Sequence, residues 1–112
     1  MRVYSVWVPI LVSDSEGWVS KAMERLPDQR ITHYWDGQDE LVEKYKTILP
    51  TRRVDSDEYA QAWDVYLLFA SDAEWKDQPP APNFWMHQLR GVDPKNRFNA
   101  ETLAAEVKRL LN

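Results

Sequence analysis

The sequence predicts an α/β fold with three layers, α/β/α, built around one short central strand. Residues Val65–Phe69 form an unbroken run of apolar side chains with β-branched and aromatic residues among them, which is typical of a strand buried on both faces. Two strand-like segments precede it, and each is followed by an amphipathic helical segment that a proline ends. The chain has 112 residues, the size of one domain, so we expect a single domain over residues 1–112.

The first strand is predicted over residues 2–12, where side chains with high β propensity are concentrated. Pro9 has no N–H to donate to a strand ladder, so regular pairing should end near it. The next four residues, Ser13-Asp14-Ser15-Glu16, have the pattern of a capping box, with a serine at the cap and a glutamate three residues later. We therefore expect a helix from this box to about Leu26, ended by Pro27.

The second strand is predicted over residues 30–36, and Asp36 is expected to cap the helix that follows. That helix should end at Pro50, and the polar residues 51–61 are predicted to be a connection. Its apolar stripe, at helical spacing, is Leu41, Val42, Tyr45, Ile48 and Leu49.

The last part of the chain holds a proline-rich loop over residues 72–82, a strand over 83–89 and a final helix over 100–111 capped by Asn99. The segment 83–89 is short enough to be a helical turn instead, and this alternative stays open. The predicted order is β-α-β-α-β-β-α. Helical crossovers favour parallel pairing of the first two strands, and the last two are expected to pair antiparallel in a small mixed four-stranded sheet.

Four segments resemble parts of the thioredoxin-like fold superfamily, and together they span most of the chain. Trp7-Val8-Pro9 before a helix cap is similar to the end of that fold's first strand. Trp35-Asp36 and the helix after it resemble the second strand and its helix, Val65–Phe69 the third strand, and 103–111 the closing helix. The segments AWDVYLL and FWMHQL also resemble parts of small uncharacterised bacterial proteins, a likeness that supplies no function.

The chain departs from that superfamily where its redox chemistry resides. Redox members place Cys-x-x-Cys at the start of the first helix, where the helix N-terminus lowers the thiol pKa. This chain has no cysteine, and Ser13–Glu16 stands at that place. The proline expected before the third strand is replaced by Gln61-Ala62-Trp63. The resemblance therefore implies a degenerate member that is not a thiol–disulfide oxidoreductase and lacks the usual peptide-docking proline.

Charge and composition narrow the classes of partner. The net charge is −4, with basic and acidic residues interleaved, so a basic stripe for nucleic acid is not expected. The apolar run 3–12 is far shorter than the about 20 residues that span a bilayer, so no membrane association is expected. The absence of cysteine fits a cytoplasmic protein and excludes thiolate nucleophiles and metal–thiolate sites. No cofactor is predicted.

One candidate site lies where the first two strands end, because ligands of open α/β sheets collect beyond the carboxyl ends of parallel strands. The functional interpretation is a small polar cleft walled by Trp7 and Trp35; the simpler one, which we favour, is two helix caps. The candidate residues at this edge are Trp7, Ser13, Asp14, Glu16, His33, Trp35 and Asp36.

The two histidines, His33 and His87, lie in predicted strands among aromatic residues. A triad with Asp36 or Asp64 and a serine, or a two-histidine metal site, is conceivable, but no signature or ligand spacing supports either. We expect structural histidines, no catalytic residues and no metal. Enzymatic activity is not the favoured class.

A second candidate is an aromatic patch beside the proline-rich loop, because aromatics with methionine often mark binding surfaces. The leading hypothesis is a binding module that uses this patch for a protein partner, a small ligand or a second copy of the chain. The simpler interpretation is a loop that buried aromatics hold over the sheet. The alternative is a small-ligand-binding protein or enzyme with a pocket at Trp7, Trp35, Asp36 and His33. The patch consists of Trp75, Phe84, Trp85, Met86 and His87.

Overall fold

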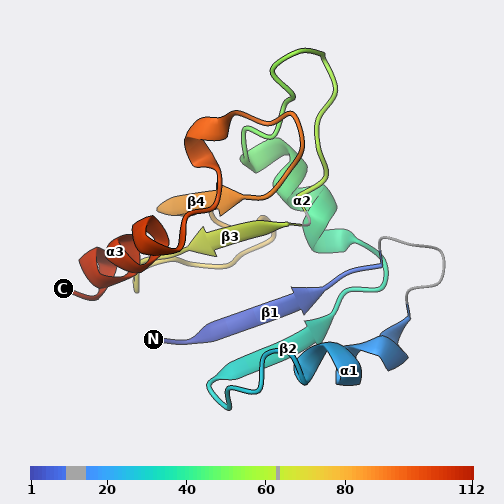
Figure 1. Ribbon diagram of the computed structural model, residues 1–112, viewed down its shortest axis with the longest axis vertical. Helices are drawn as coiled ribbons and strands as arrows, with labels where there is room; N and C mark the ends of the chain where they lie inside the picture. The colour runs from blue at the N-terminus through green and yellow to red at the C-terminus, as the bar shows by residue number, and fades with distance from the viewer. Residues whose placement is uncertain (10–14, 63) are drawn as a thin grey trace. The chain divides into compact units, whose positions relative to one another are not determined.

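The computed structural model describes residues 1–9, 15–62 and 64–112. Within them the chain is mixed α/β, with three α-helices and two two-stranded sheets (Figure 1). It divides into two compact units, residues 1–41 and 42–112, which are described in turn. Among the helices of the described residues, none is both long and apolar enough to cross a membrane. The single domain and the joined four-stranded sheet stay predictions.

The first unit is a parallel strand pair with a short helical crossover. Its strands pair from Val3↔Ile31 to Trp7↔Trp35, which confirms the predicted parallel pairing. Burial alternates along both strands, so one face is half-buried and the other exposed. The elements are β1 (Val3–Trp7), the 3₁₀ turn η1 (Glu16–Trp18), α1 (Val19–Met23) and β2 (Ile31–Trp35).

The first strand and the first helix are both shorter than predicted. β1 ends at Trp7, two residues before Pro9. This agrees with the expectation that regular pairing ends near Pro9, which has no N–H to donate. The helical segment starts at Glu16 as a 3₁₀ turn and its α-helical part ends at Met23. Arg25 and Leu26 then donate to carbonyls three residues back, a tightened turn ahead of Pro27. The predicted capping box falls partly on Ser13 and Asp14, which lie outside the described residues.

The second unit combines an antiparallel strand pair with two longer helices. The strands pair from Val65↔His87 to Leu68↔Phe84, which confirms that 83–89 holds a strand and that the last two strands are antiparallel. Asn99 caps the last helix by accepting from the Thr102 N–H. The elements are α2 (Glu40–Ile48), whose first two residues belong to the first unit, β3 (Val65–Leu68), β4 (Phe84–His87), the 3₁₀ turn η2 (Pro94–Asn96) and α3 (Ala100–Leu111).

The core of the second unit uses residues that the sequence pattern assigns to a connection. Ala60 is 2% exposed and packs with Leu89 and Val92, against which Val65 and Trp85 lie. Residues 51–61 are held in place by bridges between Arg52 and Tyr59 and between Arg53 and Val92. The segment is polar in sequence but contributes buried positions, Thr51 among them.

The prediction that the central strand is buried on both faces is wrong. All four residues of β3 are half-buried. The half-burial means that neither face of β3 is fully covered. In the described residues β3 is hydrogen-bonded to β4 alone, so β3 is also an edge strand of a two-stranded sheet. Tyr66 on β3 stacks on Phe98, with ring centroids 4.5 Å apart.

Candidate functional site

A hollow of about 200 Å³ opens in the first unit where β1 and β2 end. Three indole rings dominate its wall, and among the described residues no charged side chain lines it. We call it the Trp hollow. Trp7 and Trp35 were both expected at this edge, whereas Trp18 was not among the predicted site residues. The lining residues are Trp7, Val8, Ser15, Trp18, Val19, Ala22 and Trp35.

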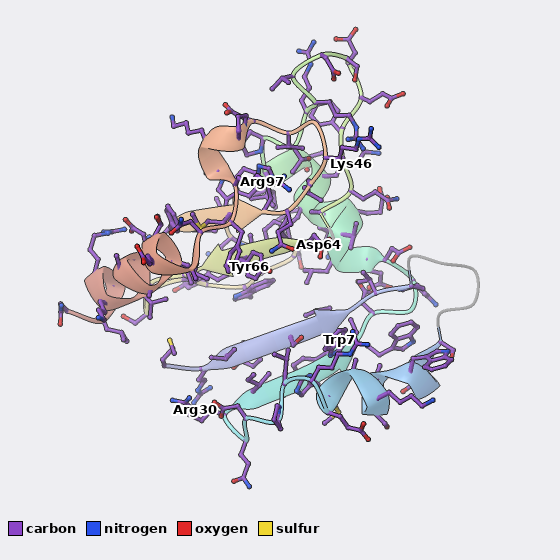
Figure 2. The ribbon with its side chains drawn as sticks, in the orientation of Figure 1. Trp7, Arg30, Lys46, Asp64, Tyr66 and Arg97 are labelled. Atoms are coloured by element: carbon purple, nitrogen blue, oxygen red, sulfur yellow. The ribbon has the colours of Figure 1, made fainter. Side chains whose placement is uncertain are left out.

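Trp7 is held in place by its neighbour on β2, on the side of the strand pair that α1 covers (Figure 2). The Trp7 Nε1 donates a hydrogen bond of 2.9 Å to His33 Nδ1. The two rings also stack, with centroids 6.0 Å apart and planes within 13° of parallel. Because an indole nitrogen only donates, His33 accepts at Nδ1 and its neutral ring carries the proton on Nε2. His33 therefore positions Trp7.

Trp35 is positioned by the backbone around it. The Asp36 N–H donates to the Trp7 carbonyl at 2.8 Å, which extends the parallel ladder past β2 and fixes the two tryptophans at the same level. A Cβ added at Gly37 would lie 2.8 Å from Trp35 Nε1, closer than side chains approach. Glycine at this position therefore leaves room for the indole ring.

Asp36 acts as the helix cap that the sequence predicts. Its carboxylate accepts from the N–H of Glu40 at 3.1 Å and of Leu41 at 2.9 Å, the first two residues of α2. One oxygen serves each donor. The charge thus offsets the N-terminal end of α2, and Asp36 adjoins the Trp hollow without lining it.

Trp18 forms the open side of the hollow. Its side chain is 52% exposed, and the Lys21 ammonium lies over its ring at 4.4 Å from the centroid. Ser15, also a lining residue, is the extended residue before η1, and its side chain makes no cap hydrogen bond. Glu16 is exposed and does not line the hollow. Ser13 and Asp14 lie outside the described residues.

The five residues of the aromatic patch do not gather on one surface. Met86 is 3% exposed and His87 is fully buried. Side chains alternate along β4, so Trp85 and His87 share one face and Phe84 and Met86 the other. Trp75 is 55% exposed and contacts other residues, Phe69 at a ring distance of 5.5 Å and Tyr45 at 6.3 Å.

His87 has the geometry of a structural histidine. Its Nδ1 accepts from the Leu89 N–H at 3.0 Å, so its Nε2 carries the proton and donates to the Asp93 carbonyl at 2.8 Å. The side chain thereby ties β4 to the segment that leads into η2. Both ring nitrogens are engaged with backbone, which agrees with the expected structural role.

A larger, shallower hollow of about 340 Å³ lies in the second unit. Arg53, which lines this hollow, makes its contacts within the hollow itself. Its Nε lies 4.0 Å from a Glu58 carboxylate oxygen, and its Nη1 donates to the backbone carbonyl of Arg90. Gly91 adopts a φ of 74°, which suits glycine at this bend. We consider this hollow a solvated surface depression.

The chain has no match among protein-family models, curated proteins or solved structures. Within the residues that the structure describes, no three potential metal ligands cluster. The Trp hollow offers indole faces, aliphatic surface and one hydroxyl. These groups suit the binding of a small molecule better than proton transfer.

Proposed function

We propose that this protein is a binding module that takes one small ligand, or one small group of a ligand, in the Trp hollow. The observation that carries the proposal is the convergence of three indole rings from β1, η1 and β2 on one hollow. Tryptophan is among the residues enriched at the hot spots of protein interfaces. The place also agrees with the rule that ligands of α/β proteins bind at the carboxyl ends of strands.

The size of the hollow limits the ligand. A volume of about 200 Å³ exceeds the roughly 150 Å³ cavity that holds benzene, but it is below the roughly 300–1,000 Å³ of sites for drug-sized ligands. One ring or one compact headgroup therefore fits. The walls are pre-organised by His33 for Trp7 and by Gly37 for Trp35, which reduces the entropy lost on binding.

A thermal-shift screen against small metabolites tests the proposal. A ligand at about 100 times its dissociation constant stabilises the native state by about 2.7 kcal/mol, enough to raise the melting temperature by several degrees. The shift should disappear in Trp18→Ala and persist in Trp75→Ala, a matched control because the two tryptophans are 52% and 55% exposed. A shift that Trp75→Ala removes and Trp18→Ala keeps would place the site elsewhere.

The second candidate function is a protein-binding surface centred on Trp75. The observation in its favour is that Trp75 is 55% exposed and that its ring packs against the ring of Phe69, with centroids 5.5 Å apart. This surface is smaller than the sequence predicts, because Met86 and His87 are buried. A second copy of the chain is the partner we would test first, by light scattering of the native protein and of Trp75→Ser. A 13.2 kDa monomer at high concentration would remove the homodimer.

We also infer a thioredoxin-like relationship, with both strand pairs in one four-stranded sheet of a single cytoplasmic domain. Support comes from the parallel β1–β2 pair with its helical crossover, the antiparallel β3–β4 pair and the closing helix α3, in that order along the chain. Backbone NMR tests the joined sheet. In a joined sheet, one strand of the β1–β2 pair must show cross-strand contacts to one strand of the β3–β4 pair. The absence of such contacts would contradict the four-stranded sheet.

A further inference from the structure

We infer that the Trp hollow takes a small quaternary ammonium compound of the choline class. The inference rests on the proposed function and names its ligand. Three features of the hollow carry it: the type of ring in the wall, the charge around it and the small number of hydrogen-bonding groups that it offers.

The wall is made of the side chain that attracts cations best. Among the aromatic residues, tryptophan gives the strongest cation–π interaction, and three indoles line this hollow. One of them already makes such an interaction, since the Lys21 ammonium lies 4.4 Å from the centroid of Trp18. The Trp18 ring therefore already attracts a cation in this structure.

The charge around the hollow favours a cation over an anion. In residues 1–9 and 15–41 the acidic side chains outnumber the basic ones, six to four. Two carboxylates follow lining residues in the sequence: Glu16, which is exposed, follows Ser15, and Asp36, which also caps α2, follows Trp35. Lys21 is the exception, because its ammonium occupies Trp18 and would repel a second cation. Replacing Lys21 with a neutral residue therefore tests whether the ligand is a cation.

The hydrogen-bonding capacity selects a quaternary over a primary ammonium. A primary ammonium carries three N–H donors, and burying them without acceptors costs free energy. Among the described side chains that line the hollow, Ser15 is the single oxygen acceptor, and the indole N–H groups only donate. A trimethylammonium group has no N–H to satisfy. This compact headgroup suits the available volume, and trimethyllysine carries the same headgroup. We commit to a free small molecule as the ligand, and the modified protein side chain is an outcome of the test.

The experiment compares choline with 3,3-dimethyl-1-butanol, which has the same shape with a neutral carbon in place of nitrogen. Both are titrated into the full chain, followed by tryptophan fluorescence and by the indole N–H signals in NMR. We expect choline to bind at least about tenfold more tightly than the alcohol. Trp18→Leu, which keeps apolar surface but removes the π face, should lower affinity for choline and leave the alcohol nearly unchanged.

The Lys21→Gln variant should bind choline several-fold more tightly, because it removes a competing ammonium. Trp75→Ala is the control and should change neither titration. Equal affinities for choline and the alcohol would overturn the cation assignment while leaving a binding hollow, so the proposed function would stand. If neither compound binds, the inference is wrong. The metabolite screen then tests the proposed function separately. Weaker binding in Lys21→Gln would also overturn it.

A third arm uses the N-acetyl amide of trimethyllysine. If it binds at least about tenfold more tightly than choline, the ligand is a modified protein side chain, and the assignment to a free small molecule is wrong. Equal or weaker binding supports the small molecule.

Discussion

The two units of the chain differ in how completely they bury their side chains. In the described part of the first unit, residues 1–9 and 15–41, no side chain is fully buried. The second unit contains the buried positions: Val42, Tyr45, Leu49, Thr51, Ala60, Ala62, Pro79, Met86, His87, Leu89 and Val92. Yet the first unit carries the Trp hollow, whose tryptophans are half-buried or exposed.

This difference indicates a division of roles. Burial of apolar surface and of satisfied polar groups supplies most of the stability of a fold, so the second unit should dominate the free energy of unfolding. Binding surfaces need aromatic groups that solvent and ligand can reach, and they are drawn from less stable regions. Substitutions in the second unit should therefore change stability, and those around the Trp hollow should change binding.

The largest effect on stability is expected for His87→Ala. The substitution leaves the Leu89 N–H and the Asp93 carbonyl without their side-chain partners and opens a cavity at a fully buried position. We expect a loss of about 3–4 kcal/mol in the free energy of unfolding, measured by urea denaturation. His33→Ala, in the first unit, removes a half-buried ring and should cost about 1 kcal/mol. Equal costs for the two histidines would contradict the division between the units.

The next effect is a loss of stability at alkaline pH that Tyr45 controls. Burial raises the pKa of Tyr45 from 10.0 to about 12, and its hydroxyl donates to the Pro80 carbonyl at 3.1 Å. Between these two values the unfolded chain loses the phenolic proton while the folded protein keeps it. The contribution is therefore complete below pH 10 and is lost as the pH rises towards 12. At 1.36 kcal/mol per pKa unit, the shift of about two units amounts to about 3 kcal/mol.

The measurement is the urea midpoint between pH 9 and pH 12. Tyr45→Phe should lower the midpoint at neutral pH, since the Pro80 carbonyl loses its donor, and should flatten the alkaline decline. Tyr4→Phe is the control because Tyr4 is 55% exposed in the first unit, and it should leave the decline unchanged. An unchanged slope in Tyr45→Phe would show that other groups cause the decline.

A gain in stability is expected for Thr51→Val. Thr51 is fully buried, and within the described residues its Oγ1 has no hydrogen-bond partner. Valine has nearly the same shape without the hydroxyl, so the free energy of unfolding should rise by about 1–2 kcal/mol. Thr51→Ser keeps the hydroxyl and removes the methyl group, and should lower stability. If valine destabilises the protein, the hydroxyl is satisfied in solution.

The sequence predicts the strand pairing well because pairing follows local signals. A helical crossover favours parallel pairing, as between β1 and β2, whereas residues 69–83, which connect β3 to β4, contain no helix. Both pairs are therefore as expected. The caps at Asp36 and Asn99 are equally local. Burial is not local, and the run Val65–Phe69 shows this. Its composition is typical of a strand covered on both faces, but composition does not show how many helices or sheets pack against that strand.

The candidate sites show the same limit. Trp7 and Trp35 could be predicted because both stand at strand ends, whereas Trp18 lies in the helical segment that follows and was not among the predicted site residues. Its position in the first helical turn after that edge is the signal that could have found it. In the aromatic patch the period of two along β4 already separates Trp85 from Met86, a signal that outweighs their proximity in sequence.

The smallest effect concerns the exposed turn before β2. The Asp28 carboxylate accepts two hydrogen bonds from the Arg30 guanidinium, at 2.6 Å from Nη2 and 3.0 Å from Nε, and one from the Arg30 N–H at 2.9 Å. The side-chain bonds, more than the charge, lower the pKa of Asp28 from 3.8 to about 2. The stabilising contribution is therefore present above pH 3.8 and is lost as the pH falls through about 2.

Arg30→Ala should move the pKa of Asp28 towards 3.8 without reaching it, because the backbone bond remains. Arg30→Lys keeps the charge but loses the planar pair of donors, so its pKa should lie nearer to that of the alanine variant. Carboxyl NMR titration measures both. The melting temperature at neutral pH should hardly change, since the two side chains are 79% and 40% exposed and such pairs contribute little. If lysine preserves a pKa of about 2, Coulomb attraction and not the paired hydrogen bonds holds the carboxylate ionised. A large fall in melting temperature would instead mean that this open turn contributes to stability as the buried positions of the second unit do, which would break the contrast between the units.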